Sequence, residues 1–183
     1  MQGLVISYQA NSILWSLKEC NIIDEPADVL ICSASVSLNL SGGVGADLLG
    51  RYGTNMQIEL HRIIAARTPH AAKQGEVFIY SGTELPYKAV LHVVAVDGWY
   101  HSTTQVVKET TEKALQMAMA LNARKVVLTA LATGYGDLSL SDFAEAVRPL
   151  LNRGFHPIAE VCICLLEDYR LVELANNLFP ASK

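Results

Sequence analysis

Residues 28–52 read DVLICSASVSLNLSGGVGADLLGRY, and this stretch decides the fold. It begins with a continuous apolar run, Val29–Cys32, which is typical of a strand buried on both faces of a sheet. A polar segment follows, then the glycine-rich Gly42–Gly45, and then a helical pattern from Gly45 to Tyr52. A buried strand that leads through a glycine-rich segment into a helix is typical of α/β proteins.

The same alternation of strands and helices extends over the rest of the chain. Together with Val29–Cys32, five further apolar runs between turn signals predict six strands. The five are Leu4–Tyr8, Val77–Tyr80, Lys88–Val96, Lys125–Leu131 and Val161–Leu166. Helical spacing predicts helices at Gly45–Tyr52, Met56–Ala66, Ser102–Asn122, Ser139–Leu151 and Asp168–Leu178.

Two local signals refine the ends of these helices. Ser102 and Gln105 are three residues apart and predict a capping box at the start of the third helix. Pro149 is expected to bend the last turns of the fourth helix, because proline cannot donate a backbone hydrogen bond.

The connections predict how the strands pair. Strands joined by a helix need a crossover, so most pairs are expected to be parallel. Residues 81–87 are too few for a crossover, so Val77–Tyr80 and Lys88–Val96 are expected to pair antiparallel. The predicted fold is a three-layer α/β/α sandwich with a mixed, mostly parallel six-stranded sheet, as one domain over residues 1–183.

Composition narrows the class of protein. The chain has 183 residues, of which 51% are hydrophobic and 17% charged, and this excludes a disordered protein. The formal net charge of −4 disfavours nucleic acid as a general partner, because such binding needs a basic surface. The sequence contains no apolar run long enough to cross a membrane and no basic segment at its start, so a cytoplasmic protein is expected.

The four cysteines are expected to be reduced thiols. Cys32, Cys162 and Cys164 lie in apolar runs, where cysteine behaves as a small hydrophobic residue. A zinc site usually needs two close cysteine pairs. This chain has one such pair, Cys162 and Cys164, because Cys20 and Cys32 are not close in the sequence. No metal and no cofactor are therefore expected.

Two glycine-rich loops are expected at the carboxyl ends of strands, where ligands of α/β proteins bind. Gly42–Gly45 lies in the loop that leads into the first helix, and Thr133–Gly136 lies in the loop before the fourth. Glycine lets the backbone approach a phosphate closely, and helix N-termini offer free N–H donors. Two such loops side by side could hold a diphosphate, although glycines after strands also occur in plain turns.

Neither loop matches a common nucleotide motif. Gly-Lys-Ser/Thr does not occur, and Gly42–Gly45 has no third glycine at the spacing of a dinucleotide fingerprint. Ordinary nucleotide hydrolysis and nicotinamide redox chemistry are therefore both disfavoured.

Three segments in the right order resemble the macro domain family, whose members bind ADP-ribose. They are ADVLICSASVSLNLSGGVGADLLGRYG, GEVFIYSGTELPYKAVLHVVAV and ARKVVLTALATGYGDLSLSDFAEAV. The resemblance implies a cleft with adenosine at one side, the diphosphate between the two loops, and the distal ribose near the first loop. The ligand-binding residues it implies are Asn11, Ser12, Ser33, Gly42, Gly43, Val44, Gly45, Thr133, Gly134, Tyr135, Gly136 and Asp137.

The chain departs from the family pattern at three places. The paired asparagines of the family fall on Cys32 and Ser35, and Ser35 offers a hydroxyl in place of the amide that helps to position water in hydrolytic members. The acid that recognises the adenine amino group falls on Asn11 or Ser12, which carry no charge. The second loop is about one residue shorter than in many members.

Titratable residues near the loops are the catalytic candidates. Ser35, Asp47 and His101 are the three, with His101 in the loop after a strand and suited to acid–base chemistry near neutral pH. The alternative for Asp47, as for Asp137, is a helix cap. His92 lies within an apolar strand and is expected to be a core residue.

Three functions remain open after these observations. In the first, the chain binds ADP-ribose or a close derivative and hydrolyses it, as a phosphatase, deacetylase or mono-ADP-ribosyl hydrolase would. Alternatively it is a reader that binds without turnover, which the serine at position 35 favours. As a third possibility, the fold has diverged to bind another nucleotide or RNA, or serves as a scaffold. Expected partners are an ADP-ribose-type small molecule or an ADP-ribosylated macromolecule; the sequence leaves the oligomeric state open.

Overall fold

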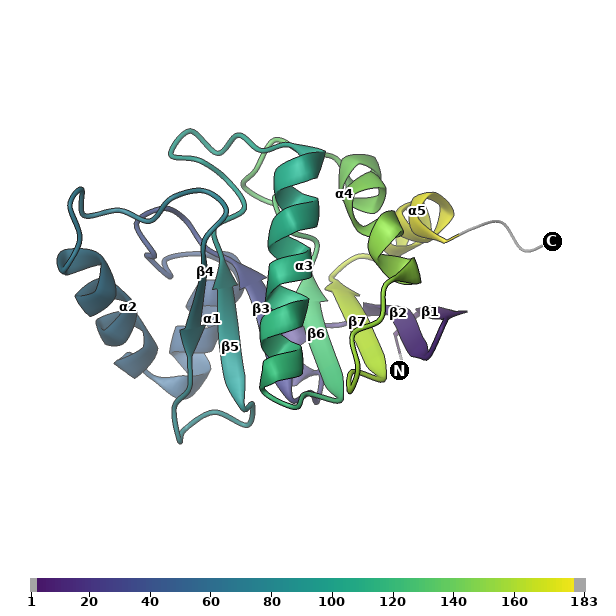
Figure 1. Ribbon diagram of the computed structural model, residues 1–183, viewed down its shortest axis with the longest axis horizontal. Coiled ribbons are helices and arrows are strands. Elements are labelled where there is room, and N and C mark those ends of the chain that lie inside the picture. The colour runs from purple at the N-terminus through teal and green to yellow at the C-terminus, as the bar shows by residue number, and fades with distance from the viewer. Residues whose placement is uncertain (1–2, 180–183) are drawn as a thin grey trace.

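A seven-stranded sheet forms the centre of the computed structural model, which describes residues 3–179 (Figure 1). The spatial order of the strands is β1-β2-β7-β6-β3-β5-β4. Their bounds are β1 Val5–Ala10, β2 Ile13–Glu19, β3 Val29–Ser33, β4 Val77–Tyr80, β5 Ala89–Val93, β6 Lys125–Thr129 and β7 Glu160–Leu165. The five inner strands, β2, β7, β6, β3 and β5, pair in parallel. The two outer strands, β1 and β4, each pair antiparallel with their neighbour.

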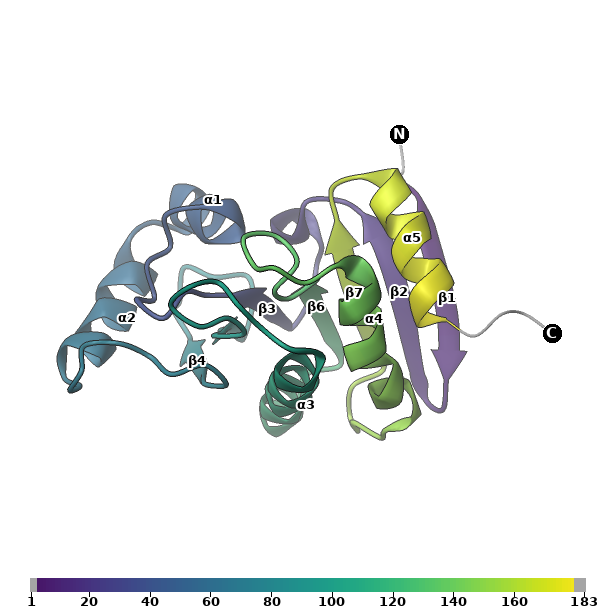
Figure 2. The ribbon, with the colours of Figure 1, turned by 90° about the horizontal axis from the view of Figure 1, so that it is seen from above.

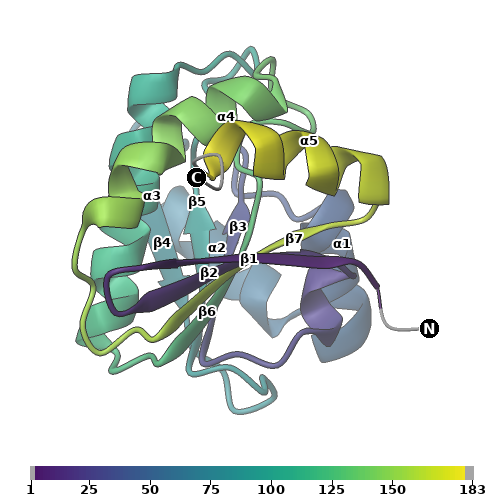
Figure 3. The same ribbon diagram turned by 90° about the vertical axis from the view of Figure 1, so that its right-hand side faces the viewer.

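Helices cover both faces of this sheet. One face carries α1 (Gly43–Tyr52), α2 (Asn55–Ala65) and the short 3₁₀ helix η1 (Ile22–Asp24), and the other carries α3 (Thr104–Ala120), α4 (Leu140–Val147) and α5 (Asp168–Leu178). Figure 1 shows α3 in front of the sheet and α1 behind it, and the view from above in Figure 2 shows these two helices on opposite sides of β3. Figure 3 shows α4 and α5 together over one face. The predicted three-layer sandwich and the antiparallel β4–β5 pair are therefore confirmed.

The prediction of six strands was wrong by one, because β2 was missed. Ile13, Trp15 and Leu17 are fully buried, and the residues between them face the other side of the sheet. This alternation with polar residues differs from the continuous apolar runs of the other inner strands. The turn before β2 is made by Asn11, whose φ of 51° is tolerated by asparagine better than by most residues.

The two signals for helix ends had different outcomes. The side chain that caps α3 is that of Thr103, which accepts a hydrogen bond from the Val106 N–H, whereas the Ser102 hydroxyl donates to the Ala95 carbonyl. The capping box predicted at Ser102 was therefore wrong: the N-cap is Thr103, and Val106, three residues later, has no side-chain acceptor to complete a capping box. Pro149 lies in a second 3₁₀ helix, η2 (Arg148–Asn152), which replaces the last turns of the predicted fourth helix.

The buried polar groups near the centre of the sheet are neutral. His92 on β5 is fully buried between Cys32 Sγ and Met56 Sδ, and burial lowers the pKa of its imidazole to about 4. Burial also raises the pKa of the Cys32 thiol to about 12. As predicted, both residues belong to the core, and so do Cys162 and Cys164.

Candidate functional site

A pocket of about 560 Å³ opens at the carboxyl ends of the parallel strands. Its lining comes from five separate segments of the chain: residues 20–22, 33–47, 95–100, 129–136 and 164–170. Each of these segments follows, or overlaps the end of, one of the parallel strands β2, β3, β5, β6 and β7. The volume is in the range of sites that hold nucleotide-sized ligands.

The first glycine loop forms one wall of the pocket. Gly43 has a φ of +52°, a conformation that favours glycine, and it is the first residue of α1. The N-cap residue, Gly42, has no side chain to accept from the first N–H groups of α1, and the first turn of this helix carries no acidic residue. Such a helix start provides free N–H donors and a partial positive charge for an anion.

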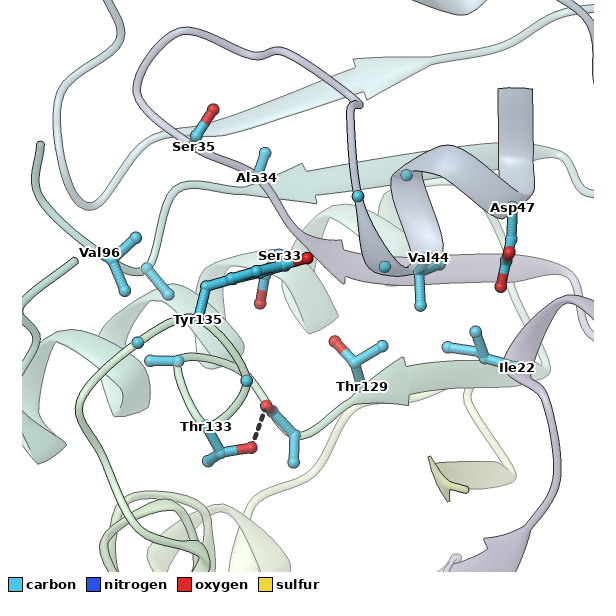
Figure 4. A pocket seen from close by; sticks show the side chains of 18 of the residues that line it. Ile22, Ser33, Ala34, Ser35, Val44, Asp47, Val96, Thr129, Thr133 and Tyr135 are labelled. Atoms are coloured by element: carbon cyan, nitrogen blue, oxygen red, sulfur yellow. Dashed lines mark hydrogen bonds between the residues drawn. The ribbon is translucent and has the colours of Figure 1, made fainter. Parts of the chain in front are cut away.

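The second glycine loop lies opposite the first one. Figure 4 shows the Tyr135 ring reaching across the pocket toward the first loop. A methyl group placed on Gly42 would lie 2.7 Å from the Tyr135 hydroxyl oxygen, so the two loops approach each other closely there. The Tyr135 side chain is nevertheless 76% exposed, because it lies over the mouth of the pocket.

A third segment, residues 97–102, borders the second loop. The Asp97 carboxylate accepts hydrogen bonds from the backbone N–H groups of His101 and Trp99, and these bonds hold its pKa below the usual range. The Asp137 carboxylate accepts from the Ser102 N–H and so joins this segment to the second loop. The Tyr100 ring lies 6.5 Å from the Tyr135 ring, centroid to centroid.

One end of the pocket is largely apolar. Ile22 from η1 and Val44 from α1 face each other across this end, and Thr129 lies beside Ile22 (Figure 4). Ser35 and Val96 lie at the opposite end of the pocket (Figure 4). Leu165 and Leu166 at the end of β7 also line the pocket, and the Leu166 side chain is 70% exposed. Apolar walls of this kind suit a flat heterocyclic base.

The polar groups near this end are only partly engaged. The Asn21 side chain accepts from the Ile23 N–H and donates to the Asp47 carboxylate over 3.3 Å. Within residues 3–179, the Thr129 hydroxyl oxygen is buried and has no hydrogen-bond partner. Cys20 and Cys164 also line the pocket.

The structure brings most of the predicted site residues together. Those that line the pocket are Ser33, Ser35, Gly42, Gly43, Val44, Gly45, Asp47, Thr133, Gly134, Tyr135 and Gly136. Asp137 lies just outside, where it holds the 97–102 segment. His101 is exposed and does not line the pocket, whereas its neighbour Tyr100 does.

Asn11 and Ser12 lie at the opposite edge of the sheet from the pocket. They form the turn between β1 and β2, at the amino end of β2, whereas the pocket lies at its carboxyl end. The resemblance placed these residues just after the first strand of the sheet. Because β2 was not predicted, the turn after β1 was taken for the segment that enters the site. After β2, the chain enters the pocket with Cys20, Asn21 and Ile22, none of which was predicted as a site residue.

One cluster outside the pocket has side chains of the kinds that bind metals. Ligand atoms of Glu25, Glu160 and Cys162 lie within 4.8 Å of one another. The Lys125 ammonium, however, lies 2.7 Å from Glu25 and 3.3 Å from Glu160, and Lys18 also bonds Glu25. Burial raises the pKa of Glu25, but the two lysines outweigh it and lower the net value. The cluster is therefore an internal ion-pair network.

The fold and the pocket together define an α/β protein with two facing glycine loops at the carboxyl edge of its sheet. Residues 32–147 match the family model described as Macro domain, and the chain belongs to this family. A curated relative from Streptomyces griseus, a macro domain-containing protein, is 25% identical over 160 residues, which cover 86% of this chain and 90% of the relative.

Solved macrodomains share the whole fold at low sequence identity. The Oceanobacillus iheyensis macrodomain with ADP superposes with a TM-score of 0.86 at 16% identity, over 97% of this chain and 96% of that chain. The Trypanosoma brucei macrodomain in complex with ADP-ribose gives a TM-score of 0.76 at 18% identity, over 94% of this chain and 73% of that one. Within residues 3–179, every helix is too short or too polar to cross a membrane.

Proposed function

We propose that this protein binds ADP-ribose, or a close derivative of it, in the pocket between the two glycine loops. The observation that carries the proposal is the pair of loops itself. The uncapped start of α1 and the backbone around Gly134 face the same space, with nothing within 4 Å of the position of a Gly134 Cβ. A diphosphate there would receive backbone N–H donors from both sides.

The ends of the pocket fit the rest of such a ligand. Ile22, Val44 and Leu166 would enclose the adenine base, and Asn21 lies beside them as a polar group. Ser35 and Tyr100 line the other end, where the distal ribose would lie. The macrodomains of similar structure that hold ADP and ADP-ribose support this choice of ligand.

Binding without turnover is the form of the function that the side chains favour. The Ser35 hydroxyl lies 2.9 Å from the Ser37 hydroxyl and has no base beside it, and His101 does not line the pocket. Ser35, Asp47 and His101 therefore do not form a nucleophile–base pair. Hydrolysis is the second candidate, and the Asp47 carboxylate in the pocket favours it, because a carboxylate can orient an attacking water.

Calorimetric titration with ADP-ribose tests the binding, with AMP and ADP as comparison ligands. We expect micromolar affinity for ADP-ribose and weaker binding of AMP. The absence of heat and of thermal stabilisation at millimolar ADP-ribose would contradict the proposal.

Turnover assays then separate the two forms of the function. ADP-ribose 1″-phosphate, O-acetyl-ADP-ribose and a mono-ADP-ribosylated protein would each be incubated with the wild type and with Asp47→Ala. A reader releases no product from any of them. A hydrolase releases product from at least one, and Asp47→Ala lowers that rate.

A further inference from the structure

The charged residues of the pocket are unevenly matched to an anionic ligand. Among the described residues that line it, Asp47 and Glu167 are acidic and Arg170 alone is a lysine or an arginine. A diphosphate brings two further negative charges into this space. Backbone N–H groups supply donors but no full positive charge, so the position of Arg170 matters for the binding of any phosphate.

Arg170 reaches the pocket from α5 and lies against the start of the second glycine loop. Its Nη2 is 3.5 Å from Thr133 Oγ1, and its Nη1 is 3.5 Å from a carboxylate oxygen of Glu167. Both distances are at the outer limit for a hydrogen bond. A guanidinium has five N–H donors, so most of the hydrogen-bonding capacity of Arg170 is left for a closer acceptor.

The partners of Arg170 indicate which part of the ligand it meets. Thr133 begins the second glycine loop, while Glu167 follows Leu165 and Leu166 at the apolar end of the pocket. Arg170 therefore lies between the place proposed for the base and the place proposed for the diphosphate. The Arg170 side chain is 29% exposed, so it is partly shielded from water.

We propose that Arg170 binds the phosphate nearest the nucleoside and supplies the full positive charge that the glycine loops lack. This inference rests on the proposed function, because it assigns a residue to the same ligand. A guanidinium can bond two phosphate oxygens at once, and such charge-assisted bonds are stronger than neutral ones. Glu167 competes with the phosphate for the guanidinium in the free protein.

The experiment compares the wild type with Arg170→Gln, Arg170→Lys and Glu167→Gln, each titrated with AMP, ADP and ADP-ribose. Arg170→Gln keeps a polar side chain but removes the charge. It should raise the Kd of all three ligands by a similar factor of about ten. The three ligands should lose affinity equally, because each of them carries the phosphate that is attached to the adenosine. Arg170→Lys should lose less, since it keeps the charge but not the planar fork.

Glu167→Gln is the matched control, because it should act in the opposite direction. Removing the competing carboxylate should strengthen AMP binding by about two- to threefold, and raising the salt concentration should shrink every difference. Thermal unfolding without ligand should be the same for all four proteins. A change in that midpoint for Arg170→Gln alone would assign the residue to folding and overturn the inference.

Three further results would overturn the inference while leaving the proposed function intact. Arg170→Gln could bind ADP-ribose within twofold of the wild type, or it could lose affinity for ADP and ADP-ribose but not for AMP. Glu167→Gln could also weaken binding as much as Arg170→Gln does. If the wild type itself binds none of the three ligands, the proposed function fails and the role of Arg170 fails with it.

Discussion

The glycines of the two loops are needed for different reasons: those of the first loop are constrained by packing or by backbone conformation, whereas the second loop contains one constrained and one unconstrained glycine. In the second loop, a Cβ on Gly136 would lie 2.3 Å from the Ala132 carbonyl oxygen, whereas a Cβ on Gly134 would meet nothing within 4 Å. In the first loop, a Cβ on Gly45 would lie 3.1 Å from Leu40, and one on Gly43 would keep an unfavourable φ of +52°. Gly136 is thus required by the backbone, and Gly134 leaves open the space that a ligand would use.

A glycine-rich pattern therefore combines two requirements that the sequence alone does not separate. Some glycines allow the loop to fold, and others keep the surface free for a phosphate. Substitutions that tell the two apart should change stability at one position and affinity at the other.

The largest expected effect is the loss of stability in Gly136→Ala. The added methyl group would clash with the Ala132 carbonyl, which also accepts the Leu138 N–H, and Ala132 already has a φ of 62°. We expect the free energy of unfolding to fall by about 2–3 kcal/mol, as in overpacked sites. Urea unfolding measures it, with Gly134→Ala as the control, which should change by less than about 0.5 kcal/mol. Equal losses in the two variants would remove the distinction between them.

A large effect on affinity is expected for Gly134→Val. The side chain would enter the open space beside the second loop, where its Cβ would have no protein atom within 4 Å. Stability should stay within about 0.5 kcal/mol of the wild type, while the Kd for ADP-ribose should rise at least about tenfold. Gly154→Val is the matched control, because its Cβ also meets nothing within 4 Å and Gly154 is outside the pocket lining. Unchanged affinity in Gly134→Val would place the diphosphate elsewhere.

A smaller effect is expected where the loops meet, at Tyr135. Its ring covers the mouth of the pocket and its hydroxyl approaches Gly42, but it is 76% exposed. Tyr135→Ala should raise the Kd for ADP-ribose by about three- to fivefold, mainly through faster dissociation, with no loss of stability. Tyr169→Ala, at a residue 66% exposed and outside the pocket lining, should change neither quantity. Dissociation rates by stopped flow measure the difference.

The smallest effect concerns the 97–102 segment and its response to pH. The folded pKa of Asp97 lies below its ordinary value of 3.8, because the His101 and Trp99 N–H groups bond the carboxylate. Its contribution to stability is therefore fully present above about pH 4 and is lost as the pH falls through the folded pKa. We expect the loss of stability between pH 5 and pH 3 to be slightly smaller in Asp97→Asn. An identical pH dependence in urea unfolding would show that this carboxylate does not anchor the segment.

Much of the fold could be predicted because strands and helices leave strong local patterns. The run Val29–Cys32 and the short 81–87 connection were enough to predict the buried central strand and the antiparallel edge. The strand β2 was missed because Ser16 and Lys18 face a polar cluster around Glu25 and Glu160. Polar residues on one face of a strand make it resemble a loop when the sequence is considered alone.

The site was predictable only where it depends on backbone. Both glycine loops line the pocket as expected, because their composition reflects local geometry. His101 lies outside the pocket lining because the segment is shaped by the hydrogen bonds that Trp99 and His101 donate to Asp97 and by the φ of 66° at Tyr100. Neither feature leaves a clear signal in the sequence. Arg170 could not be found because its approach to Thr133 depends on the order of β6 and β7 in the sheet.

The assembly of the pocket from five segments between residues 20 and 170 has a thermodynamic consequence. None of the five segments contains both glycine loops and the apolar end. A ligand that contacts all three parts therefore binds only the completely folded sheet. Its binding free energy then adds to that of global unfolding, by about 2.7 kcal/mol at a ligand concentration one hundred times the Kd. The unfolding temperature would rise with the logarithm of ligand concentration, and the cellular lifetime of this protein would depend on how much ligand is present.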